Sequence, residues 1–144
     1  MAFRHIPNGI PGIETRMPLL YSEGVLAGRI SLNRFVDLTA TQPARAYGLY
    51  PRKGTLAIGS DADLVIWEER EFTLANEQLH HAVDYTPYAG MTLRAWPAMT
   101  LLRGQIVWDG ARFAGTPGQG QFLPRGLPNV APPSARKGTQ PAWR

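Results

Sequence analysis

The sequence of 144 residues predicts an α+β fold, with short helices first, strands next and an extended tail last. Apolar residues recur at helical spacing before residue 50, and apolar runs separated by glycine turns follow up to residue 115. The last 29 residues hold six of the thirteen prolines and four of the fifteen glycines, which is typical of an extended arm. We therefore divide the chain into residues 1–50, 51–115 and 116–144.

The chain opens with a turn, because Asn8 stands between Pro7 and Gly9 and Asn-Gly is a favoured turn pair. A short helix is predicted over about Met17–Glu23, since proline at position 18 is best tolerated in a first helical turn. Glycine commonly follows a helix, so Gly24 is expected to end this one.

Two further helices are expected before residue 50. Ser31 is a suitable N-cap, and an apolar face follows it at helical spacing, made of Leu32, Phe35, Val36 and Thr39. Thr41 is expected to cap the third helix, with Pro43 in its first turn and Gly48 just after its end.

After residue 50 the pattern changes to that of strands. The mostly apolar run Ala62–Glu68 predicts a buried strand, and Met99–Gly104, Gln105–Gly110 and residues 111–115 predict three shorter ones. Glycine-containing connections join these strands in hairpin fashion, which favours sheet packed against sheet. In the tail, only residues 120–126, "GQFLPRG", have the composition of a stretch that docks on another surface.

The composition excludes several classes of protein. Hydrophobic residues make up 44% and charged residues 18%, as in a globular protein, and no apolar run approaches the length of a membrane helix. The net charge of +4 comes from a tail without acids, so no basic face for nucleic acid is predicted. Because there is no cysteine, a reducing compartment, the cytoplasm, is the expected location.

Asn8 is the candidate binding residue that the sequence offers. A carboxamide both donates and accepts hydrogen bonds, which suits a cyclic imide or ureide, although support of the turn would explain the same asparagine. Three histidines and no cysteine cannot supply a metal centre at this spacing, since His80 and His81 would point to opposite faces of a strand. No serine, histidine or carboxylate pattern predicts a catalytic residue here.

Four stretches of the chain resemble the C-terminal portion of the dihydropyrimidinase and D-hydantoinase family of amidohydrolases. They are "IPNGIPGIETRMPLLYSEGV", "SLNRFVDLTATQPARAYGLYPRKGTLAIGSDADLVIWE", "LHHAVDYTPYAGMTLRAWPAMTLLRGQIVWDG" and "GQFLPRG". The resemblance covers the chain up to about Pro128, and the block from "ATQPARAYGL" to "GSDADLVIW" also marks the wider amidohydrolase superfamily. Gln42 departs from the asparagine that the superfamily often has before the proline.

The resemblance implies that residues 1–50 are the last loop and closing helices of an incomplete (β/α)8 TIM-type barrel. Residues 51–115 would be the C-terminal part of a β-sandwich, and residues 116–144 an arm used in homo-oligomer contacts. The family hydrolyses hydantoin or dihydropyrimidine rings with a pair of divalent metal ions, commonly zinc. Asn8 would contact the substrate ring, with Pro7 and Gly9 setting its angle, and this chain would supply no metal ligand.

The sequence therefore predicts part of a cyclic-amide hydrolase that is inactive as an isolated chain. A non-enzymatic oligomerisation or interaction module related to the same family is the alternative. A self-contained small sandwich that binds a ligand is a third hypothesis, and it would need residues 1–50 to fold onto residues 51–115 without a barrel.

Overall fold

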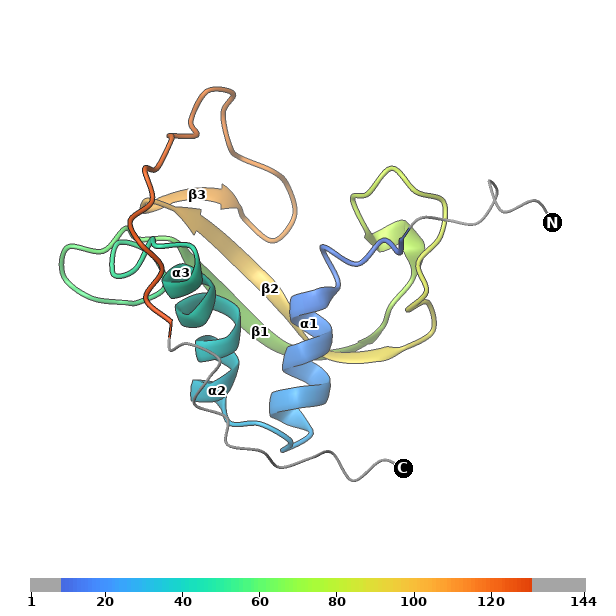
Figure 1. Ribbon diagram of the computed structural model, residues 1–144. Helices are drawn as coiled ribbons and strands as arrows, with labels where there is room; N and C mark the ends of the chain where they lie inside the picture. Colours follow the sequence, from blue (N-terminus) through green and yellow to red (C-terminus); the bar gives the residue numbers. More distant parts are fainter. Residues whose placement is uncertain (1–8, 131–144) are drawn as a thin grey trace, which may run out of the picture.

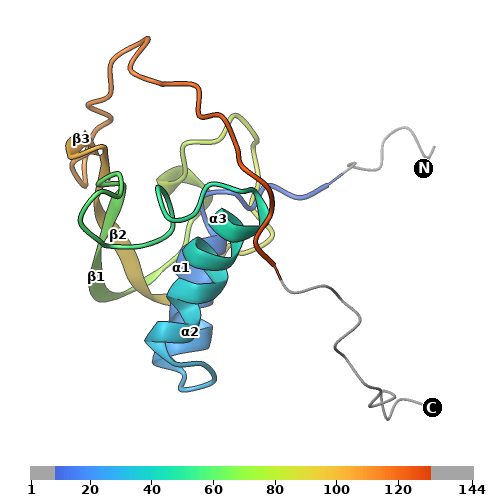
Figure 2. The same ribbon diagram turned by 60° about the vertical axis from the view of Figure 1, so that its left-hand side comes forward.

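The computed structural model describes residues 9–130, in which one helical segment lies against a three-stranded antiparallel sheet and a second packs beside the first (Figures 1 and 2). The first segment joins α1 (Arg16–Leu20) to the π-helical η2 (Tyr21–Leu26). The second joins α2 (Leu32–Val36), the π-helical η3 (Asp37–Thr41) and α3 (Gln42–Ala46). Within the described residues, no helix is long and apolar enough to cross a membrane.

The first helix is longer than predicted, because Gly24 does not end it. Gly24 is buried inside η2, where an added Cβ would lie 3.1 Å from Ile30 Cδ1. Its small size therefore permits close packing, whereas the left-handed residue beyond the helix is Gly28, with φ of +72°. Pro18 stands in the first turn, as predicted.

The predicted boundary between the second and third helices is wrong. Ser31 is confirmed as an N-cap, since its Oγ accepts the Arg34 N–H at 3.1 Å. Thr41, however, has helical angles, and its hydroxyl donates to the Gly54 carbonyl at 2.7 Å instead of capping a helix. The helix widens to π geometry just before Pro43, which relieves the clash of a proline ring with the preceding turn.

The end of α3 matches the prediction. Gly48 has φ of +67°, the Leu49 N–H donates to the Ala44 carbonyl at 2.8 Å, and the Gly48 N–H donates to Arg45. This is the Schellman arrangement that glycine allows after a helix. The tail docks at the same place, because the Gly126 N–H donates to the Gly48 carbonyl at 2.8 Å. Within residues 120–126, this contact is made by the last residue, and Asn129 beyond the stretch also donates to the Arg45 carbonyl at 2.9 Å.

The sheet has the order β1-β2-β3, formed by β1 (Leu64–Thr73), β2 (Thr92–Leu102) and β3 (Gln105–Trp108). Both β1 and β2 are longer than predicted. The register shifts where Trp67 faces Pro97, so Ala98 is the extra residue of a bulge, and a bulge accommodates a proline within a strand. The fourth predicted strand is reduced to a single bridge between Trp108 and Phe113.

The connection from β2 to β3 is the predicted hairpin. Arg103 and Gly104 have φ of 48° and 79°, as a two-residue type I′ turn requires. The described strands form a single sheet, whose packed face is covered by helices. The second sheet of the expected sandwich is not made by the described residues, so the sandwich stays a prediction.

Three aromatic rings form the centre of the core. Tyr21 stacks on Trp67 with ring centroids 5.0 Å apart, and Phe35 meets both rings edge-on at 5.2 and 5.9 Å. Ala95 of β2 closes the cluster from the sheet. The Tyr21 hydroxyl donates to Glu69 at 3.2 Å, and burial followed by this carboxylate raises the pKa of Tyr21. Trp67 is thus a packing residue of the core.

Candidate functional site

Residues 9–15, which lead into α1, form the described part of the predicted substrate wall. Gly9 is exposed, and an added Cβ there would meet no atom within 4 Å. Asn8 and Pro7 lie outside the described residues, so the predicted role of the turn is not tested by the structure. From Gly9 onward the segment passes Ile10 and Ile13, both largely exposed, before Thr15 becomes buried.

A long loop between β1 and β2, residues 74–91, lies against this wall. Its ends are joined by hydrogen bonds between Leu74 and Met91 and between Gly90 and Leu74, both of 2.9 Å. Between the wall and the loop is a cavity of about 410 Å³. Its apolar lining comes from both segments: Ile10, Pro11, Ile13, Leu79 and Val83.

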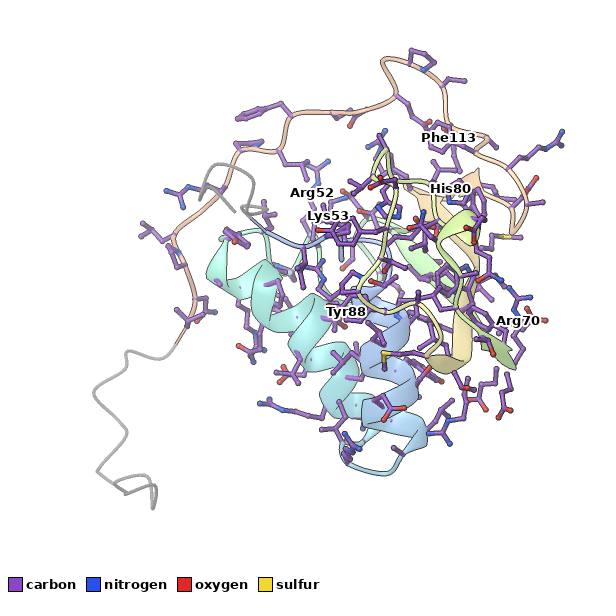
Figure 3. All side chains as sticks on the ribbon, turned by 90° about the vertical axis from the view of Figure 1, so that its right-hand side faces the viewer. Arg52, Lys53, Arg70, His80, Tyr88 and Phe113 are labelled. Carbon is purple, nitrogen blue, oxygen red and sulfur yellow. The ribbon has the colours of Figure 1, made fainter. Side chains whose placement is uncertain are left out.

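The wall and the loop are joined through Glu14 and His80. Glu14 Oε1 lies 2.8 Å from His80 Nδ1, and Glu14 Oε2 accepts the backbone N–H of His80 at 2.8 Å. The His80 ring in turn meets Trp108 of β3 edge-on, with centroids 5.0 Å apart. Figure 3 shows His80 on the side of the molecule that also carries Phe113, and both line a second cavity of about 450 Å³.

His80 and His81 do not lie on a strand, so the expected opposite orientation on two faces is wrong. Both belong to the loop, where His80 pairs with Glu14 and His81 Nε2 lies 3.2 Å from Asn76 Oδ1. Glu14 and His80 are 66 positions apart in the sequence. Nothing in the local pattern indicated that they meet, because the contact depends on how the loop folds back.

The acidic residues before β1 bind cations of the chain itself. Asp61 Oδ2 lies 2.9 Å from Lys53 Nζ and 3.1 Å from Arg52 Nε, while Asp63 pairs with Lys53 and accepts the Arg103 N–H at 2.9 Å. Figure 3 shows Arg52 and Lys53 close together. These carboxylates therefore fix the entry to β1.

Acid is expected to weaken this cluster. The hydrogen bond from Lys53, and then that from Arg52, lowers the pKa of Asp61. A carboxyl with a lowered pKa stabilises the fold above its unfolded pKa of about 3.9, and this stabilisation is lost as the pH falls through the folded value. Urea unfolding between pH 7 and pH 2 should show a loss of stability below about pH 4 that is smaller in Asp61→Asn.

The double variant with Lys53→Gln and Asp61→Asn provides the control for this experiment. Because Lys53 also pairs with Asp63, any acid sensitivity that this variant loses beyond Asp61→Asn alone measures the Lys53–Asp63 pair. An Asp61→Asn protein that loses stability in acid as steeply as the natural sequence would contradict the assignment.

The described residues contain no group of three or more histidine, cysteine, aspartate or glutamate side chains placed to hold a metal ion. Ser22 is fully buried, and its Oγ accepts the Arg94 N–H at 2.9 Å. The cavity between the wall and the loop therefore offers a ligand apolar contacts and the polar groups of Glu14 and His80. No cluster in the described range supplies the donor set of a metal pair.

Comparisons with known proteins agree with the resemblance in sequence. Residues 23–108 match the amidohydrolase family. The chain is 48% identical to D-hydantoinase from Geobacillus stearothermophilus over 124 residues, which are 85% of this chain and 26% of that protein. The structure matches D-hydantoinase from Bacillus sp. AR9 with a TM-score of 0.84 at 47% identity, covering 90% of this chain and 28% of that chain.

A second solved structure, dihydropyrimidinase from Brevibacillus agri, matches with a TM-score of 0.82 at 44% identity. The match covers 88% of this chain and 28% of that one. The chain thus spans about a quarter of the length of the curated relatives that it matches.

Proposed function

Because this chain belongs to the amidohydrolase family, we propose that it is the C-terminal part of a cyclic-amide hydrolase. The substrates would be hydantoin or dihydropyrimidine rings. The observation that carries the proposal is the identity of 47–48% to D-hydantoinases along 85% of the chain. Relatives that bear either printed name, D-hydantoinase or dihydropyrimidinase, match the structure comparably well, so both ring types remain in the proposal.

In this proposal, residues 1–50 complete a TIM-type barrel, residues 51–115 complete a β-sandwich, and residues 116–144 serve as an arm between copies of a homo-oligomer. The continuous helical segments of residues 16–26 and 32–46 support the first assignment, because they pack on the sheet and still expose Leu32 and Val36. The sheet supports the assignment of residues 51–115 to a β-sandwich, because an open cavity lined by Trp96, Trp108 and Phe113 lies on it. The cytoplasm is the proposed compartment, in keeping with the lack of cysteine.

Within the proposed site, Asn8 would bind the ring by donating and accepting hydrogen bonds, and Pro7 and Gly9 would set its direction. A pair of divalent metal ions, which zinc would supply in the complete enzyme, provides the Lewis acid of such hydrolases. The described residues do not fit that pair, since they offer no cluster of three ligands. In this proposal, its ligands come from polypeptide other than residues 9–130.

The test compares the isolated chain with a chimera. In the chimera, this chain replaces the matching quarter of D-hydantoinase from Geobacillus stearothermophilus, to which it is 48% identical. We expect the isolated 144 residues to bind no stoichiometric zinc and to hydrolyse no hydantoin, and the zinc-loaded chimera to open the ring. Metal-dependent turnover by the isolated chain would contradict the proposal.

Asn8 is tested in the same chimera. Asn8→Ala should lower kcat/KM roughly tenfold, since loss of a hydrogen-bonding group costs about 1 kcal/mol or somewhat more. Asn33→Ala changes an exposed asparagine on α2 and serves as the matched control, with activity close to that of the parent chimera. Equal activity in the two variants would remove Asn8 from the site.

The open cavity beside Trp96, Trp108 and Phe113 also supports the alternative, an interaction module without activity. Such a module would bind a full-length relative as a subunit. Co-purification with intact D-hydantoinase, together with an inactive chimera, would favour this second function over the first.

A further inference from the structure

We propose that Glu14 and His80 are positioning residues, which fix the direction of residues 9–13 and so set the place of the substrate wall. This inference rests on the proposed function, in which Gly9 is the described end of that wall. It concerns residues to which the resemblance assigned no role. The contact joins segments 66 positions apart, so it orients one part of the fold relative to another.

The geometry makes the contact a two-point attachment. The two oxygens of one carboxylate bind two groups of one residue, the ring Nδ1 and the backbone N–H of His80, each at 2.8 Å. An ionised carboxylate only accepts hydrogen bonds, so the His80 nitrogen that faces it must carry the proton. Two bonds from one side chain fix orientation as well as distance, which a single bond does not.

His80 in turn contacts the sheet. The His80 ring packs edge-on against Trp108, which belongs to β3. Gly12 of the wall lies beside Tyr88 of the loop, since a Cβ added there would lie 3.7 Å from the Tyr88 ring and hydroxyl. The sheet and the loop thus determine where the wall leaves α1.

The wall has little else to hold it on the side toward Gly9. Ile13 is 89% exposed and Ile10 is 65% exposed, so apolar burial contributes little to their placement. Gly9 has no neighbour within 4 Å of an added Cβ. Loss of the Glu14–His80 contact would therefore let the wall move without unfolding the core, and substrate binding would weaken more than the reaction step.

The first experiment uses the 144-residue chain and needs no activity. Amide hydrogen exchange measured by NMR should show the His80 N–H exchanging at least tenfold faster in Glu14→Ala, because that amide is bound by Glu14 Oε2. Glu23→Ala removes a surface carboxylate that pairs with Arg29 at 3.6 Å and not with His80, and it should leave the His80 amide unchanged. Equal exchange in Glu14→Ala and the natural chain would overturn the contact.

The second experiment measures kinetics in the active chimera. His80→Ala should raise KM about fivefold or more while kcat changes less than twofold, because positioning acts on binding. His80→Asn should restore KM, since its side-chain N–H can stand in for Nδ1–H. A KM unaltered in His80→Ala, or a loss of kcat that His80→Asn does not repair, would overturn the positioning role.

The two experiments separate failure of this inference from failure of the proposed function. An active chimera with unchanged KM in His80→Ala contradicts the inference and leaves the function standing. An inactive chimera, combined with fast exchange of the His80 amide in Glu14→Ala, contradicts the function and leaves the contact between wall and loop standing.

Discussion

Replacing Phe35 with alanine is expected to lower the free energy of unfolding of this chain by about 3–5 kcal/mol. Phe35 is 3% exposed and lies edge-on to both Tyr21 and Trp67 at the centre of the core. Removing the ring forfeits its transfer free energy and leaves a cavity that its two stacked neighbours cannot fill without losing their own contacts. Urea unfolding of the 144-residue chain, followed by tryptophan fluorescence, measures the change.

Phe122→Ala is the matched control for this substitution. Phe122 is 90% exposed on the tail, so the same chemical change there should alter stability by no more than about 0.5 kcal/mol. Similar losses in the two variants would show that the helices do not pack on the sheet through Phe35. Such a result would also contradict the packing of Tyr21, Phe35 and Trp67 into one core.

Gly54→Ala is expected to destabilise the chain by about 2–5 kcal/mol, from two causes that add. Gly54 has φ of +82°, a conformation that costs an alanine about 1–2 kcal/mol. An added Cβ would also lie 2.5 Å from Ala44 Cβ and 2.8 Å from the Ala40 carbonyl oxygen. Both neighbours belong to the second helical segment, so that segment would have to move away from the Thr41–Gly54 hydrogen bond.

Gly59→Ala separates the two causes. Gly59 has a similar φ of +91°, but no atom lies within 4 Å of an added Cβ. It should therefore show the backbone cost alone, and the difference between the variants in urea unfolding gives the cost of the close approach. If Gly59→Ala destabilises as much as Gly54→Ala, the contact between residue 54 and the helix is not as described.

Local signals in the sequence were sufficient where neighbours along the chain decide the structure. Ser31 caps α2, Gly48 ends α3 in the left-handed conformation, and Arg103-Gly104 makes the hairpin turn, all as predicted. In each case, the hydrogen bonds or dihedral angles involve residues fewer than six positions apart. The family resemblance was also evident from sequence, because the matching stretches cover most of the chain.

Local signals failed where a distant segment decides the structure. Glycine is a residue type that commonly follows a helix, but Ile30 packs closely against Gly24 and the helix continues. Threonine is a residue type that commonly caps a helix, but the Thr41 hydroxyl donates a hydrogen bond to the Gly54 carbonyl, 13 positions away. The charged part of β1 was not predicted as strand, yet pairing with β2 extends it to Thr73.

The candidate site divides in the same way. By itself, the sequence determined the family, and it contains three histidines and no cysteine; the asparagine turn at Asn8 stays a prediction. Only the tertiary structure decided that Glu14 meets His80, since a 66-residue separation carries no periodicity by which to pair them. The physical reason is that capping and turn chemistry act over a few residues, whereas contacts between loops depend on the packing of the whole sheet and its helices.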